Sequence, residues 1–155
     1  GGVEPLLSWK YVHGNQEGCM NESDIAYIAG LFDGEGCVSY RKTMKKRGNY
    51  PAYKTWDIRL EISMTEQSII RWVHEVLKVG TFSKKPPGKG QLGKKMQYRW
   101  RCGFRDAYYV CCLLYPYAHV KLDKIQKVID HYADKKIMNG NIVKLSEYKK
   151  LMSLE

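Results

Sequence analysis

The sequence has no apolar run long enough to cross a bilayer and no stretch that resembles a secretory signal. Its five cysteines are an odd number, and none of them belongs to a Cys-x-x-Cys pair. Cys111 and Cys112 are adjacent within an apolar run, which is typical of buried thiols, and the four histidines are scattered. A structural zinc site is therefore not expected. We predict a reducing, intracellular compartment, in a phage or microbial host or in an organelle.

Acidic residues are scarce relative to basic ones. The 155 residues include 26 Lys+Arg and 16 Asp+Glu, which gives a formal net charge of +10. This excess favours a polyanionic partner, nucleic acid or an anionic membrane, although many basic proteins owe their charge to solubility or to tails. We pursue nucleic acid and predict no membrane partner.

The length predicts one domain, placed at residues 23–155 after an N-terminal arm at residues 1–22. Hydrophobic periodicity predicts the element order α-β-β-α-β-β-α-α, an α+β class with a curved antiparallel sheet and helices on one face. The predicted elements are a helix at about 24–33 capped by Ser23, strands at 37–43 and 55–64, a helix capped by Thr65 that Gly80 ends, strands at 81–85 and 96–102, and helices at 106–115 and 122–132. A last short helix is predicted at about 142–152.

The polar faces of the predicted strands are rich in arginine. Ser39, Arg41, Arg59, Ser63, Arg99 and Arg101 alternate with apolar residues, and two Lys-rich segments flank them. Outward positions of a half-exposed antiparallel sheet are often simply solvated. The alternative is a curved, basic saddle that enters the major groove of DNA as a β-ribbon.

The helix at 24–33 runs into two acids, Asp33 and Glu35. The helix dipole disfavours a carboxylate at that end by about 0.3–1 kcal/mol, a cost that vanishes when the acid binds a cation. Ala26, Ala29 and Gly30 form a small-residue face that permits close approach of a second helix. If that helix comes from a second copy, twofold symmetry brings both Glu35 carboxylates together as a divalent-metal site, as metal-assisted phosphodiester hydrolysis requires.

The stretch IAGLFDGEG at Ile28 to Gly36 resembles the motif of the LAGLIDADG homing endonucleases. Ala29, Gly30, Leu31, Asp33 and Gly36 match the family name letter for letter, and Glu35 keeps a carboxylate where the second Asp stands. ISMTEQSIIRW with LKVGTF, and YPYAHVKLDKIQKV, resemble further family segments, so the similarity covers roughly residues 23–132. The chain has a single such motif, which points to the homodimeric class, where each subunit reads half of a pseudo-palindromic site.

The resemblance implies a staggered, metal-dependent double-strand break in DNA. It implies that Glu35 binds Mg²⁺, for which Mn²⁺ or Ca²⁺ can substitute in binding, with the Gly34 carbonyl as a second oxygen. Lys121 would stabilise charge on the phosphate or polarise a water, and Glu66 with Gln67 would organise water. The implied dimer interface is Ala26, Ala29, Gly30 and Asp33. The implied DNA-binding residues are Ser39, Arg41, Thr43, Lys45, Lys46, Arg47, Arg59, Glu61, Ser63, Lys84, Lys85, Arg99 and Arg101. The alternative functions are a DNA-binding regulator that has lost cleavage and an RNA-splicing maturase.

Overall fold

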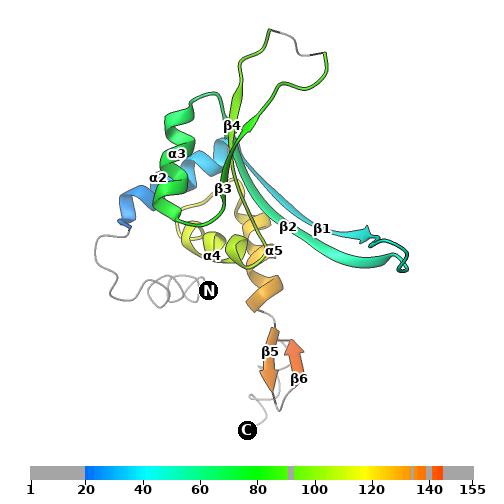
Figure 1. The fold of residues 1–155 in the computed structure, drawn as a ribbon. Helices are drawn as coiled ribbons and strands as arrows, with labels where there is room; N and C mark the ends of the chain where they lie inside the picture. The colour runs from blue at the N-terminus through cyan, green and yellow to red at the C-terminus, as the bar shows by residue number, and fades with distance from the viewer. Residues whose placement is uncertain (1–19, 91–92, 134, 139–140, 145–155) are drawn as a thin grey trace.

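The computed structural model describes residues 20–90, 93–133, 135–138 and 141–144 (Figure 1). Its helices are α2 (Glu22–Glu35), α3 (Gln67–Leu77), α4 (Arg105–Leu114) and α5 (Leu122–Ala133). Its strands are β1 (Gly36–Lys45), β2 (Tyr53–Met64), β3 (Thr81–Lys85), β4 (Gln97–Gly103), β5 (Lys135–Met138) and β6 (Asn141–Lys144). No helix in these ranges is long and apolar enough to span a membrane.

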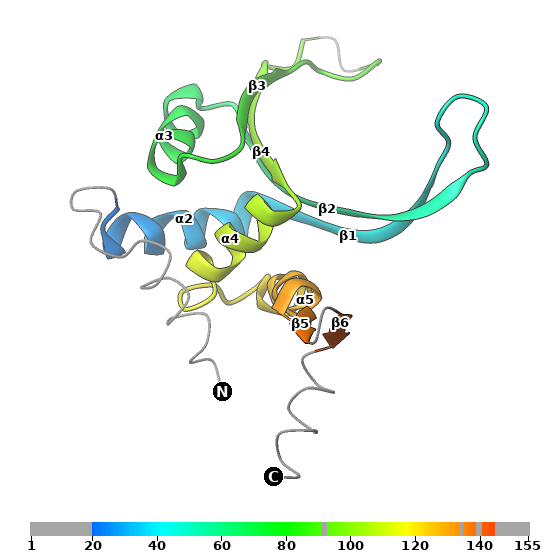
Figure 2. The same ribbon diagram turned by 60° about the horizontal axis from the view of Figure 1, so that its bottom comes forward.

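The first four strands form one antiparallel sheet in the order β1-β2-β4-β3. Figure 2 shows this sheet curving around an open concave side, with helices α2, α3, α4 and α5 on the outer, convex side. The prediction of an α+β fold with a curved antiparallel sheet and helices on one face is confirmed. β5 and β6 make a separate two-stranded sheet.

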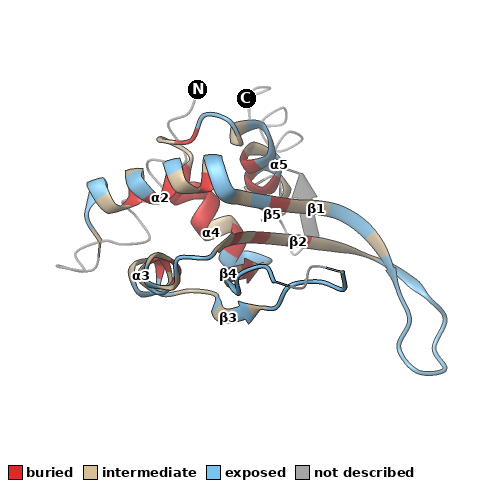
Figure 3. Cartoon of the chain, turned by 90° about the horizontal axis from the view of Figure 1, so that it is seen from above, coloured by how far each residue is buried: buried red, intermediate tan, exposed pale blue. Residues whose placement is uncertain are grey.

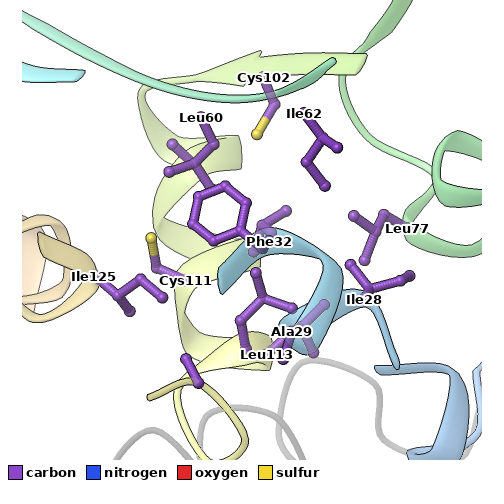
Figure 4. Close-up of a cluster of buried hydrophobic side chains, with 14 of the residues drawn as sticks. Ile28, Ala29, Phe32, Leu60, Ile62, Leu77, Cys102, Cys111, Leu113 and Ile125 are labelled. Atoms are coloured by element: carbon purple, nitrogen blue, oxygen red, sulfur yellow. The ribbon is translucent and has the colours of Figure 1, made fainter. Parts of the chain in front are cut away.

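The core lies between the convex face of the sheet and the helices. Alternation along β2 buries Ile58, Leu60 and Ile62, and each of these side chains is at most 1% exposed. Figure 4 shows side chains from the sheet and from all four helices meeting around Phe32. The indole N–H of Trp100, the largest buried side chain, donates to the Val79 carbonyl at 2.9 Å. Cys111 and Cys112 are buried free thiols, as their apolar surroundings in the sequence predict.

Helix α2 begins and ends at different residues from those predicted. Its N-cap is Asn21 and not Ser23, because the Asn21 side chain accepts from the Asp24 backbone N–H at 2.8 Å. The helix continues through Asp33 and Gly34 to Glu35, and Gly36 is its C-cap. A Cβ at Gly36 would overlap the ring of Phe32 and lie 2.5 Å from its carbonyl oxygen, so glycine is required where the helix turns into β1.

Two further details correct the sequence analysis. The N-cap of α3 is Glu66 and not Thr65. Asn141–Lys144 pairs with β5 as a strand, where the sequence suggested the start of a helix. The rest of that predicted helix, and most of the predicted N-terminal arm, lie outside the described residues.

Candidate functional site

Glu35 is the last residue of α2, and its side chain is exposed. The last turn of the helix contains no basic residue of its own. Its neighbour Gly34 is also exposed. Within the described ranges, no three His, Cys, Asp or Glu side chains cluster as a metal site. One copy of the chain therefore offers a single exposed carboxylate at this end of α2.

Asp33 connects this helix end to the loop that enters α5. Its carboxylate accepts from the backbone N–H of His119 at 2.8 Å and from that of Lys121 at 3.0 Å. Burial alone would raise the pKa of Asp33, but the backbone hydrogen bonds from Lys121, His119 and Val120 lower it by more, so the net shift is downward. The carboxylate thus stays ionised and holds the loop in place. Sequence spacing gave no sign of this contact between residues so far apart in the chain.

Lys121 is held at the same helix end by its side chain. Its ammonium donates to the backbone carbonyl of Asp33 at 2.8 Å, where the helix leaves carbonyl groups without an intrahelical partner. The Lys121 ammonium is therefore fixed to the last turn of the helix that ends at Glu35. The side chain of Lys121 is only half-buried and remains accessible from solvent.

The segment that enters α3 lies close to this centre. Gly36 is paired with Ile62 at the end of the β1–β2 ladder, so the last residues of β2 begin beside the end of α2. Glu66 accepts from the Ser68 hydroxyl at 2.8 Å. The Gln67 amide lies against the Arg71 guanidinium, and with its oxygen turned toward the arginine it accepts from Nε at 3.0 Å and from Nη2 at 2.9 Å. Glu66 is exposed and Gln67 half-buried. Gln67 thus serves here to orient Arg71.

The surface of α2 differs from its predicted small face at one position. Ala29 is fully buried in the core of its own chain, so it does not contribute to the open face of the helix. Gly30 and Gly34 are exposed, and Ala26, four residues before Gly30, is half-buried. Figure 3 shows exposed stretches along α2. A Cβ at either glycine would meet nothing within 4 Å. The chain's own packing therefore requires neither glycine.

On the concave face, Glu61 of β2 holds basic side chains from two other strands. Arg101 donates to one carboxylate oxygen through Nη2 at 2.9 Å and Nε at 3.2 Å, and Lys85 contacts the other at 3.3 Å. Arg99 lies 3.9 Å from the same carboxylate. Burial raises the pKa of Glu61, but the Arg101 hydrogen bond and the Lys85 charge outweigh it, so its pKa lies below the ordinary value. The arginines are oriented before any ligand arrives.

A second acid, Asp57, pairs with Arg41 at 3.4 Å and with Arg59 at 3.9 Å. The sequence analysis did not select Asp57 or Ser83, whose hydroxyl accepts from Arg99 at 3.3 Å. Both contacts are explained by the strand register, because Arg41 is directly opposite Asp57 and Ser83 is directly opposite Arg99. Residues that are opposite each other on neighbouring strands have their side chains on the same face of the sheet.

The remaining predicted DNA-binding residues divide by position. Ser39, Thr43 and Lys45 alternate with the core-facing residues of β1, on the side of Arg41, and Ser63 shares the face of Glu61. Lys46 and Arg47 are exposed where β1 turns toward β2. Lys84 was also selected as a DNA-binding residue, and that role stays a prediction. It alternates with Lys85 and so projects on the opposite side of β3, the side of Phe82.

No protein-family model matches the sequence, and neither does any curated protein. Solved structures of homing endonucleases do match the fold. I-CvuI, in complex with the I-CreI target in the presence of Mg, is 18% identical with a TM-score of 0.55, covering 69% of this chain and 64% of its own. The archaeal intron-encoded I-Vdi141I, complexed with DNA, is 16% identical with a TM-score of 0.53, covering 68% and 64%. The group I intron-encoded I-CeuI, complexed with DNA, is 14% identical with a TM-score of 0.53, covering 74% and 55%.

This chain has the fold of the homing endonucleases, and the match spans less than two thirds of the length of those three proteins. At such low identity the likeness establishes the fold alone. The activity has to be argued from the side chains of this chain.

Proposed function

We propose that this chain acts as a homodimer that cuts double-stranded DNA, with a divalent metal, at a long pseudo-palindromic site. The proposal rests chiefly on one observation. Helix α2 ends at an exposed carboxylate, Glu35, and the Lys121 ammonium donates to the Asp33 carbonyl in the last turn of that helix. The strand that follows, β1, leads into a concave sheet face that carries oriented arginines. The solved homing endonucleases of the same fold are complexed with DNA.

The two glycines of α2 support a dimer. Glycine inside a helix costs about 0.8–1.0 kcal/mol relative to alanine, and neither Gly30 nor Gly34 is needed by the chain's own packing. Glycines four residues apart let a second helix backbone approach closely. Val120, in the loop held by Asp33, adds an apolar side chain that is 77% exposed. A twofold axis through the surface that carries the glycines would bring two copies of Glu35 together.

The donor set fits Mg²⁺ once two copies are present. This ion prefers one or two carboxylates and completes its shell with waters and phosphate oxygens. Glu35 from each copy would supply the carboxylates, with the Gly34 carbonyl as an additional oxygen, and Mn²⁺ or Ca²⁺ could replace Mg²⁺ in binding. When bound, the metal would lower the pKa of a water and polarise the scissile phosphate.

The other residues have roles that follow from their contacts. Lys121, fixed by the Asp33 carbonyl, would stabilise the charge that develops on the phosphate. Glu66 is available to orient a water, since its side chain is exposed. Gln67 would act indirectly by fixing Arg71, which also lies over the Phe82 ring at 4.3 Å.

Arg99 and Arg101 are suited to read bases. A guanidinium held on one side by Glu61 keeps N–H groups free to bind guanine O6 and N7 in the major groove. Arg41 and Arg59 have the same arrangement around Asp57. The exposed Lys45, Lys46 and Arg47 are better placed to bind phosphates.

A cleavage selection tests this function. The full chain is incubated with a randomised library of duplex DNA and Mg²⁺, and cut molecules are sequenced. The proposal predicts enrichment of one site with twofold pseudo-symmetry and a staggered cut at its centre. Binding and enrichment of a site that is never cut would contradict the enzyme and favour a regulator of the same fold. Sedimentation that gives only the 18.0 kDa single chain, with and without DNA, would contradict the dimer.

A further inference from the structure

A cavity of about 320 Å³ lies outside the proposed cleavage centre, between the edge strand β1 and helix α5. Its walls are Val38, Ser39, Tyr40 and Arg41 from the strand and Lys124 and Lys127 from the helix. Three of the six lining residues are cationic, and none carries a carboxylate. Such a lining suits an anion.

The two lysines are placed for contact with a partner. They are three residues apart on α5 and therefore share one face of it, while Ile125, Val128 and Ile129 bury the other face. Both lysines are exposed, and neither forms an ion pair with any residue in the described ranges. Their charge serves no contact within the described part of the chain.

The dimensions of the sheet indicate which anion reaches this cavity. Neighbouring strands are about 4.8 Å apart, so four strands span about 14 Å. The major groove of B-DNA is about 12 Å wide. A four-stranded sheet laid over the groove is therefore wider than the groove, so its edge strands, β1 and β3, lie against the two phosphate backbones. The cavity is at the β1 edge, and its Ser39 and Arg41 also belong to the concave face, so the two surfaces are continuous.

We propose that Lys124 and Lys127 form a phosphate-binding site that holds the backbone of the bound duplex where it passes the edge of β1. This inference rests on the proposed DNA-binding function and extends the contact surface beyond the sheet to α5. Lysine suits this position because a mobile point charge binds phosphate oxygens without reading sequence. The site contributes affinity and orientation, and the concave face contributes the choice of sequence.

The test compares wild type with the double variants K124Q/K127Q and K124R/K127R, all as the full chain. The probes are the duplex enriched by the cleavage selection, a scrambled duplex and a structured RNA hairpin. Binding is measured over a series of salt concentrations without Mg²⁺. The logarithm of the association constant falls linearly with the logarithm of the salt concentration, and each phosphate contact contributes about 0.9 to the steepness of that fall. The Gln variant should therefore show a fall that is less steep by about 1.8 for each copy of the chain. The Arg variant keeps both charges and should keep the slope. Discrimination between the two duplexes should be unchanged in both variants.

An unchanged slope for K124Q/K127Q, in a preparation where wild type binds the duplex, would overturn this inference alone. A slope that falls for the RNA hairpin but not for the duplexes would overturn it in favour of RNA. A wild type that binds no duplex would instead overturn the proposed function and this inference with it. Acylation by an amine-reactive reagent gives a second readout without any substitution: the duplex should protect Lys124 and Lys127 but leave the reactivity of Lys78 unchanged. Equal acylation of Lys124 and Lys127 with and without the duplex would contradict the site.

Discussion

Replacing Gly30 by alanine should affect the single chain and the dimer in opposite directions. Gly30 lies in the middle of the 14-residue helix α2, and an added Cβ would meet nothing within 4 Å. Alanine in a helix interior is favoured over glycine by about 0.8–1.0 kcal/mol. The free energy of unfolding of the dissociated chain should therefore rise by about 1 kcal/mol.

In the proposed dimer, the same methyl group would enter a close crossing of two helix backbones. Overpacking a well-packed contact costs about 1–3 kcal/mol, and twofold symmetry applies that cost twice. Since about 1.4 kcal/mol is a factor of ten in affinity, the dissociation constant of the dimer should rise at least tenfold. Few substitutions stabilise a chain while they dissociate its dimer.

Two measurements decide this prediction. Urea unfolding at a protein concentration below the dissociation constant of the dimer gives the free energy of unfolding of the single chain. Sedimentation over a range of protein concentrations gives the dissociation constant itself. Glu75→Ala, on the exposed side of α3, is the matched control and should leave the dimer unchanged. A Gly30→Ala chain that dimerises as tightly as wild type would refute the role of the glycine face.

Three further predictions follow from individual contacts. Asp33→Ala should lower the free energy of unfolding by about 1–3 kcal/mol, because two backbone N–H groups lose a charged acceptor. Because folding lowers the pKa of Asp33, its carboxylate contributes fully to the free energy of unfolding above the ordinary pKa of 3.8, and this contribution is lost as the pH falls through the pKa of the folded state. In urea unfolding, the free energies of unfolding of the variant and of wild type should therefore become equal in acid. Glu61→Ala should weaken the base preference of Arg101 at one position of each half-site, visible in a binding selection, since the guanidinium loses its anchor. A thiol reagent should label Cys37 rapidly in the native protein, whereas Cys111 should react only on unfolding, because burial raises its thiol pKa well above the ordinary value.

Periodicity in the sequence predicted most of the architecture. The alternation of Ile58, Leu60 and Ile62 with charged residues defined β2 and its buried face, and that pattern depends only on local geometry. The small residues of α2 were partly misassigned, because Ala29 lies where the buried and open faces of a helix meet, and only tertiary packing assigned it to the core.

Long-range contacts could not be predicted in the same way. Asp33 was expected at a helix crossing, but its carboxylate is occupied by the loop at His119 and Lys121, and no local pattern joins those segments. The ion pairs of Glu61 depend on the register of three strands, which the sequence does not specify without the loop conformations. Glu35 was selected from its place at the end of a helix and from the resemblance, and Lys121 from the resemblance alone. The structure adds that the Lys121 ammonium is held at the end of that helix.

The central claim is that Glu35 from two copies of the chain supports cleavage of duplex DNA. The most direct test is the conversion of a supercoiled plasmid that carries the selected site, with Mg²⁺, by wild type and by Glu35→Gln. We expect wild type to linearise the plasmid, and Glu35→Gln to bind the site with similar affinity without cutting it. Glu75→Gln, which removes an exposed carboxylate elsewhere, should cut like wild type. Equal cutting by Glu35→Gln, or binding without cutting by wild type, would contradict the account.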